Sequence, residues 1–200
     1  MSIEAWGDSA AKRETREASV NRFLMSLLMQ SDGSTTKLIE AIVGAKVRLA
    51  LRLQRVIPEH AMPREVRALF AGNGPFMQRV TSLAVDDVIV SDNAVFADMS
   101  RLTGGLAEKL NKGEIPLGLL IESSETRREI SGFGYAPGRD FSRLYAPSPV
   151  PADVMPGKQY AILKDGECWF YVCERFREAK LVERFWDRTI AGAVTTSVGV

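Results

Sequence analysis

Residues 159–176, QYAILKDGECWFYVCERF, contain the clearest turn signal in the sequence. Two runs of apolar and aromatic residues flank Asp165-Gly166, and an Asp-Gly pair between such runs is typical of a tight β-hairpin. We therefore predict strands over residues 159–163 and 168–176. A second hairpin is predicted upstream, with strands over residues 77–85 and 88–97 joined at Asp86-Asp87.

Two more strands are predicted, over residues 47–56 and 126–135. Polar and apolar residues alternate in the first of these strands. Arg48 and Arg52 are therefore predicted to face solvent, and Leu49, Leu51 and Leu53 to face the core. Apolar residues at helical spacing, together with capping signals, predict helices over residues 17–30, 36–43, 64–70, 102–111, 116–121 and 177–190. Consecutive hairpins imply one antiparallel sheet with helices packed mainly on one face, so the predicted fold class is α+β.

A chain of 200 residues with a net charge of +1 has the length of a single domain. We expect residues 1–14 to be a flexible leader, residues 15–190 the domain and residues 191–200 a flexible tail. The charge gives no electrostatic reason for a nucleic acid or an anionic membrane as partner. No membrane span or signal peptide is predicted, which favours a cytoplasmic location. The sequence does not determine the oligomeric state, and a monomer is slightly favoured.

Metal and disulfide chemistry have little support in the sequence. Cys168 and Cys173 are five apart in a predicted strand, so we expect their side chains on opposite faces and too far apart to bond. His60 lies in a loop bounded by prolines and is interpreted as solvated rather than catalytic. We therefore expect neither a metal nor an organic cofactor.

Two charged residues are out of pattern on predicted strands. Arg79 shares a strand face with Thr81 and Leu83, and both faces of that strand are mostly apolar. A half-buried guanidinium requires an anion, and its shape suits a carboxylate. Glu174 shares its face with Phe170 and other apolar residues, which makes it a candidate for proton transfer.

A purely structural interpretation of these charges is also open. Glu174 can form an ion pair with Arg79, Arg175 or Arg177, because ion pairs place buried charges without any catalytic role. For either residue alone, this interpretation is the simpler one.

Short motifs in a fixed order favour a functional role. They are GSTTKL at residues 33–38, SRLTGG at 100–105, IPLG at 115–118, ETRREI at 125–130 and CERF at 173–176. Together, over about residues 20–177, they resemble the motifs of chorismate lyases, which remove pyruvate from chorismate to give 4-hydroxybenzoate. The resemblance implies a chorismate lyase-like α+β fold with a buried pocket for an aromatic or cyclohexadiene carboxylate.

The resemblance also implies site residues. Arg79 corresponds to the ligand-binding arginine, and the main-chain amides of Thr35 and Leu117 share the carboxylate, as free N–H groups at helix starts can do. Glu174 corresponds to the active-site glutamate, with Arg79 facing it across the pocket. Arg127 is a candidate for the second carboxylate, and an exposed position on an edge strand is the alternative. Thr35 stands where the family usually has methionine, so the substrate is left open.

A non-catalytic protein that binds or senses a small aromatic carboxylate is the competing function. The same fold serves as an effector-sensing domain in some transcription regulators, and fold alone does not fix function. Those regulators usually carry a DNA-binding module before the sensor, and the expected leader is too short for one. The alternatives are therefore a lyase, an enzyme acting on a related aromatic acid, and a stand-alone sensor.

Overall fold

Six strands form one antiparallel sheet in the computed structural model, which describes residues 4–102, 105–113, 115–121, 124–149 and 151–196. The spatial order is β1-β2-β3-β6-β5-β4. The strands are β1 (Arg48–Ile57), β2 (Phe76–Val85), β3 (Val88–Asp98), β4 (Arg127–Pro137), β5 (Val154–Lys164) and β6 (Glu167–Phe176). Both predicted hairpins are present as β2–β3 and β5–β6, and the α+β class is confirmed.

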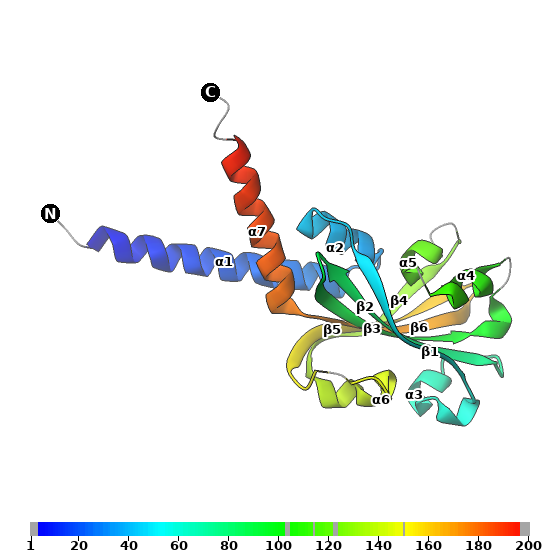
Figure 1. The fold of residues 1–200 in the computed structure, drawn as a ribbon. Coiled ribbons are helices and arrows are strands. Elements are labelled where there is room, and N and C mark those ends of the chain that lie inside the picture. The colour runs from blue at the N-terminus through cyan, green and yellow to red at the C-terminus, as the bar shows by residue number, and fades with distance from the viewer. Residues whose placement is uncertain (1–3, 103–104, 114, 122–123, 150, 197–200) are drawn as a thin grey trace.

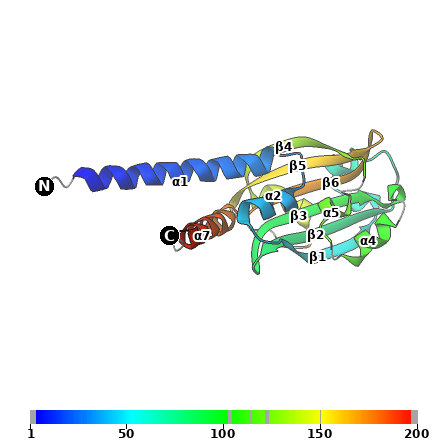
Figure 2. The ribbon, with the colours of Figure 1, turned by 90° about the horizontal axis from the view of Figure 1, so that it is seen from above.

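The helices cover both faces of the sheet, with the longer ones toward one face. They are α1 (Glu4–Gln30), α2 (Thr35–Val43), α3 (Arg64–Arg67), α4 (Leu106–Lys112), α5 (Leu117–Leu120), α6 (Ser142–Tyr145) and α7 (Glu178–Thr196), with 3-10 turns at Glu59–Ala61, Met99–Arg101 and Gly138–Phe141. In Figure 1, α2, α4 and α5 lie over one face, and α3 and α6 lie over the other. Helices α1 and α7 project away from one end of the sheet (Figures 1 and 2). None of the helices within the described residues is long and apolar enough to span a membrane.

Helix ends differ from the predictions. Helix α1 begins at Glu4, within the expected leader, where alanines and charged helix formers continue the pattern. Helix α7 continues to Thr196. Helix α4 begins only at Leu106, because Gly105 has a φ of +76° and lies outside the right-handed helix. The division into a flexible leader, a domain and a flexible tail stays a prediction.

Strand β1 departs from the predicted alternation. A bulge lies between Leu51 and Leu53, and an extra residue in one strand reverses the faces that follow it. Leu49 and Leu53 therefore pack against different apolar clusters, and Leu51 is 43% exposed. The prediction that all three leucines point inward was wrong.

A transverse row of polar residues interrupts the apolar face beneath α2 and α5. Thr81, Asn93, Glu174 and Lys158 pair in register across β2, β3, β6 and β5, and all four are buried. One apolar cluster beside the row involves α4 and α5. Another involves α1, α2 and α7. Since buried polar groups require partners, this row (the polar row) marks where the sheet can hold a ligand.

The two cysteines lie on the same face of β6. A register shift near Trp169 adds one residue between Cys168 and Phe170, so Cys168 joins Cys173 in the apolar cluster on the α3 and α6 side. Both thiols are buried and free. The prediction of opposite faces was wrong because a strand bulge is not visible in simple alternation.

Cys173 is expected to make the protein less stable at alkaline pH. Burial raises the pKa of its thiol from 9.0 to about 12. The unfolded chain therefore loses this proton first, and the contribution to stability is present below pH 9 and is lost as the pH rises toward 12. Cys173→Ala should reduce the fall in unfolding free energy above pH 9 by up to about 1.4 kcal/mol per pH unit. Urea titrations over this range measure the slope, and equal slopes for both proteins would contradict the expectation.

Candidate functional site

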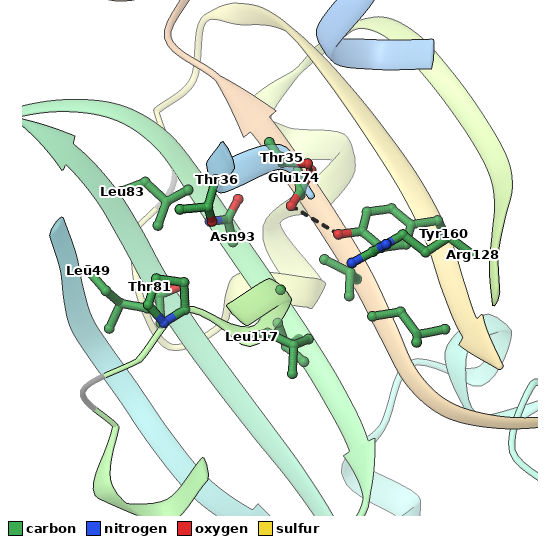
Figure 3. Close-up of a pocket in the computed structure, with 15 residues that line it drawn as sticks. Thr35, Thr36, Leu49, Thr81, Leu83, Asn93, Leu117, Arg128, Tyr160 and Glu174 are labelled. Atoms are coloured by element: carbon green, nitrogen blue, oxygen red, sulfur yellow. Dashed lines mark hydrogen bonds between the residues drawn. The ribbon is translucent and has the colours of Figure 1, made fainter. Parts of the chain in front are cut away.

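A pocket lies on the polar row, beneath the starts of α2 and α5. Its floor includes Thr81, Asn93 and Glu174, with Val95 and Val172 beside them. Its walls come from α2, from α5 and its preceding proline, and from β4 and β5: Thr35, Thr36, Pro116, Leu117, Gly118, Arg128, Tyr160 and Ile162. Figure 3 shows Glu174 and Tyr160 on one side of the pocket, with Arg128 beside Tyr160.

The pocket is narrow in this state. Its cavity volume is about 40 Å³, whereas pockets that hold a small ligand usually have roughly 300–1,000 Å³. A six-membered ring therefore requires side chains or helix starts at the pocket to move outward.

Glu174 is held by three partners at the wall of the pocket. The Thr35 hydroxyl donates to Oε2 at 2.6 Å and the Tyr160 hydroxyl donates to Oε1 at 3.0 Å. Lys158 Nζ lies 3.7 Å from Oε2. Burial, and then the carboxylate of Glu174, raise the pKa of Tyr160 well above its ordinary value. Tyr160 is therefore a hydrogen-bond donor at neutral pH.

Two cations on β5 and β4 border this carboxylate. Lys158 is 2% exposed, and burial lowers its pKa while Glu174 opposes the change. Arg128 lines the pocket, and its buried Nε has no hydrogen-bond partner among the described residues. Asp32 places a second carboxylate near Lys158, so the two cations of this cluster face two carboxylates, of which only Glu174 lines the pocket.

Arg79 lies behind the α5 side of the pocket. It is 1% exposed, and its Nη2 donates to the main-chain oxygens of Gly113 at 3.2 Å and Ile115 at 3.1 Å. Its Nε and Nη1 are buried without a partner among the described residues. Burial lowers the pKa of this guanidinium. Its partners among the described residues are neutral carbonyls, and a carboxylate could accept from the two remaining donors.

The structure brings together some of the predicted site residues. Thr35, Leu117 and Glu174 line one pocket. Arg79 does not line it, although its strand neighbour Val95 does. Arg79 also does not pair with Glu174, because they lie two strands and two residues apart, roughly 12 Å between backbones at ordinary sheet spacings.

The ion pairs expected with Arg175 and Arg177 are also not formed. Arg175 donates to three main-chain oxygens, those of Ala136, Pro151 and Asp153. Arg177 pairs with Asp92 at 2.9 Å. The buried cation beside Glu174 is instead Lys158.

Arg127 does not reach the pocket. Its side chain is 73% exposed and pairs with Glu129, whereas its neighbour Arg128 lines the pocket. Successive side chains of a strand point to opposite faces, so Arg127 has the exposed position on an edge strand that was the alternative interpretation, and Arg128 is the arginine of this strand that lines the pocket.

Sequence reasoning missed Lys158, Tyr160 and the hydroxyl of Thr35. Lys158 follows Pro156-Gly157, which is typical of a loop, but β5 already begins at Val154. In the structure, β3 of one predicted hairpin pairs with β6 of the other, and this pairing places Asn93 opposite Glu174.

Among the residues that the structure describes, no group of three His, Cys, Asp or Glu side chains could hold a metal ion.

Thr35→Val is expected to destabilise the protein by about 1–3 kcal/mol, because it removes a buried donor to a carboxylate and leaves the acceptor unsatisfied. Thr36→Val is the matched control. Thr36 is equally buried, at 5% exposure, and in the described contacts it does not donate to Glu174. Chemical denaturation of both variants measures the difference. Equal losses of stability would contradict the role given to the Thr35 hydroxyl.

The structure is an α+β domain with a pocket on one face of its sheet. No protein-family model matches the sequence, and no curated protein matches it. Among solved structures, the chain is similar to the effector domain of PhnF from Mycobacterium smegmatis, with 18% identity and a TM-score of 0.49 over 74% of this chain and 91% of that one.

Two further solved structures give the same level of similarity. The effector-binding domain of the trehalose repressor TreR from Bacillus subtilis has 16% identity and a TM-score of 0.43, over 66% of this chain and 92% of that one. A second structure of PhnF from Mycobacterium smegmatis has 18% identity and a TM-score of 0.49. This match covers 74% of this chain and 65% of that one. Similarity at this level concerns the arrangement of the backbone and does not identify a ligand.

Proposed function

We propose that this chain binds a small aromatic or cyclohexadiene carboxylate in the pocket, as a binding or sensing protein. The buried guanidinium of Arg79 carries this proposal, since its Nε and Nη1 have no partner in the described residues. Leaving such donors unsatisfied is costly, and a carboxylate that accepts from both recovers the loss through charge-assisted hydrogen bonds. A carboxylate ligand would thus supply an anion that the described residues do not place beside Arg79.

The route from the pocket to Arg79 passes the start of α5. Arg79 Nη2 holds the carbonyls of Gly113 and Ile115, immediately before the pocket residues Pro116 and Leu117. Outward movement of this segment would both enlarge the narrow pocket and uncover the guanidinium. We therefore expect the ligand to bind with opening at α5, with the main-chain amides of Thr35 and Leu117 as further donors.

The rest of the pocket suits a flat ring. Val95, Val172 and Leu117 offer apolar surface, while Thr81, Asn93 and Tyr160 supply polar groups at its edges. A mostly apolar slot with a few directed polar groups is the usual design of a small-ligand site. This combination supports a hydroxylated aromatic acid over an aliphatic one.

A chorismate lyase is the second candidate, and the position of Glu174 in the wall of the pocket favours it. Loss of pyruvate breaks the ether C–O bond and is driven by aromatisation of the ring, so positioning and one proton transfer could suffice. Glu174 is the candidate acid or base. Its contacts with Thr35, Tyr160 and Lys158 would serve equally well to fix the conformation of a binding site.

Two assays on the purified protein separate the candidates. Calorimetric titration with 4-hydroxybenzoate should show saturable 1:1 binding. Incubation with chorismate should yield neither pyruvate nor 4-hydroxybenzoate above the uncatalysed rate. Turnover would favour the lyase, and absence of binding in the first assay would overturn the proposed function.

A further inference from the structure

The segment between α1 and α2 is held by two cations next to the pocket. Lys158 Nζ donates to the carbonyl of Ser31 at 2.7 Å, and Arg128 Nη1 donates to the carbonyl of Asp32 at 3.1 Å. These two residues directly follow α1, which ends at Gln30. The cations that border Glu174 therefore also fix the chain where it leaves α1.

The pocket contacts the same segment from two other sides. Thr35, at the first turn of α2, donates to Glu174. Gly118 of α5 lies so close to Ser34 that a Cβ atom added there would be 3.0 Å from Ser34 Oγ. Residues 31–35 therefore contact helix α5, Glu174 and the two cations Lys158 and Arg128.

Among these contacts, the hydrogen bond from Arg128 to the Asp32 carbonyl is the one that an anionic ligand would change. Arg128 Nη1 donates to a neutral carbonyl, its guanidinium is also within hydrogen-bond reach of the Tyr160 hydroxyl, and its buried Nε has no partner in the described part of the chain. The neighbouring charge of Lys158 is a further source of repulsion, because Arg128 lowers the pKa of that lysine. A charged acceptor forms roughly twice as strong a hydrogen bond as a neutral one. A second anionic group, at the end of the ligand away from Arg79, therefore competes with the Asp32 carbonyl for Arg128.

We propose that Arg128 couples binding of a dianionic ring ligand to the tilt of α1, by leaving the Asp32 carbonyl for the ligand's second anionic group. This inference rests on the proposed ligand-binding function and assigns it a mechanical output. Helix α1 has 27 residues and is about 40 Å long, and it projects away from the sheet (Figure 2). A small change of angle at its base therefore moves its far end by several ångströms.

The first test needs no ligand. In Arg128→Gln, amide hydrogen exchange over residues 31–38 should be at least about tenfold faster than in the wild type, because the Asp32 carbonyl loses its charged donor. Arg127→Gln is the matched control, since that side chain is exposed and pairs with Glu129, and its exchange should match the wild type. Unchanged exchange in Arg128→Gln would overturn the proposal.

The second test measures the coupling by distances between spin labels at Ala18→Cys on α1 and Ala50→Cys on β1, both exposed positions. Cys168 and Cys173 are buried with the pKa of each raised to about 12, which leaves them poorly reactive to the label. Saturating terephthalate, which has a carboxylate at each end of the ring, should shift the distance by about 3 Å, the result of a tilt of roughly 10° over the 18 Å between the labelled residue and the base of the helix. Saturating 4-hydroxybenzoate, which has one carboxylate, should leave the distance unchanged.

The shift should occur in Arg127→Gln and be absent in Arg128→Gln at saturation. If 4-hydroxybenzoate binds but terephthalate does not, if terephthalate binds without any shift, or if the shift persists in Arg128→Gln, the coupling is wrong and the binding function stands. If calorimetry shows no binding to the wild type, the proposed function fails, and the coupling fails with it.

Discussion

Replacing Arg79 with methionine is expected to weaken 4-hydroxybenzoate binding by at least about 100-fold, or roughly 3 kcal/mol, without loss of stability. The binding loss follows from removing the charged partner of the carboxylate. Stability should stay equal or rise by about 1–2 kcal/mol, because a buried cation with unsatisfied donors is replaced by an apolar side chain of similar length. Calorimetric titration and urea denaturation measure the two effects on the same preparation.

Arg175→Met is the matched control for this variant. Both arginines are 1% exposed, but Arg175 donates to three carbonyls and stacks on Phe141 at 5.1 Å. Its replacement should cost about 2–4 kcal/mol, since the loop from residue 136 to 153 loses its central donor. If Arg79→Met lost as much stability as Arg175→Met and bound ligand normally, Arg79 would be a structural residue and the proposed role would be wrong.

Glu174→Gln is expected to have the largest effect on stability, a loss of about 3–5 kcal/mol, because it leaves Lys158 buried without its carboxylate. The double variant with Lys158→Met should recover at least half of the loss, since the two side chains act as one unit. Denaturation of the two single variants and the double variant gives the interaction energy. Additive losses would contradict the pairing.

The same variant should show a characteristic pH dependence. The pKa of Lys158 is lowered by burial, and Glu174 opposes that shift, so removing Glu174 lowers the pKa further. The unfolded chain then holds the extra proton, and stability rises with pH between the folded pKa and the ordinary value of 10.5. The loss of stability caused by Glu174→Gln should therefore become smaller as the pH is raised through this window.

If the wild-type protein turns over chorismate, Glu174→Gln should lose most of the turnover and retain product binding.

Local sequence rules were enough for the strands and hairpins of this fold. The Asp-Gly turn at 165–166 and the alternation on either side of it predicted β5 and β6, and the Asp86-Asp87 turn predicted β2 and β3. These features depend on residues close in sequence. The bulges at β1 and β6 were missed, since an extra residue in a strand changes no local composition.

The site was harder to predict because it depends on long-range pairing. The polar row exists only when β3 pairs with β6, and Arg79 on β2 is then placed away from Glu174. The cation beside Glu174 comes from β5, in a stretch whose proline and glycine indicated a loop. Thr35 was expected to contribute a main-chain amide, whereas its hydroxyl makes the described contact with Glu174.

The central claim, that the pocket binds a carboxylate through buried cations, is tested most directly by a matched pair of ligands. Calorimetric titration of the wild-type protein with 4-hydroxybenzoate and with 4-hydroxybenzamide compares the same ring with and without the charge. We expect the acid to bind at least about 100-fold more tightly than the neutral amide. Equal affinities for the two compounds, or no binding of the acid, would contradict the account.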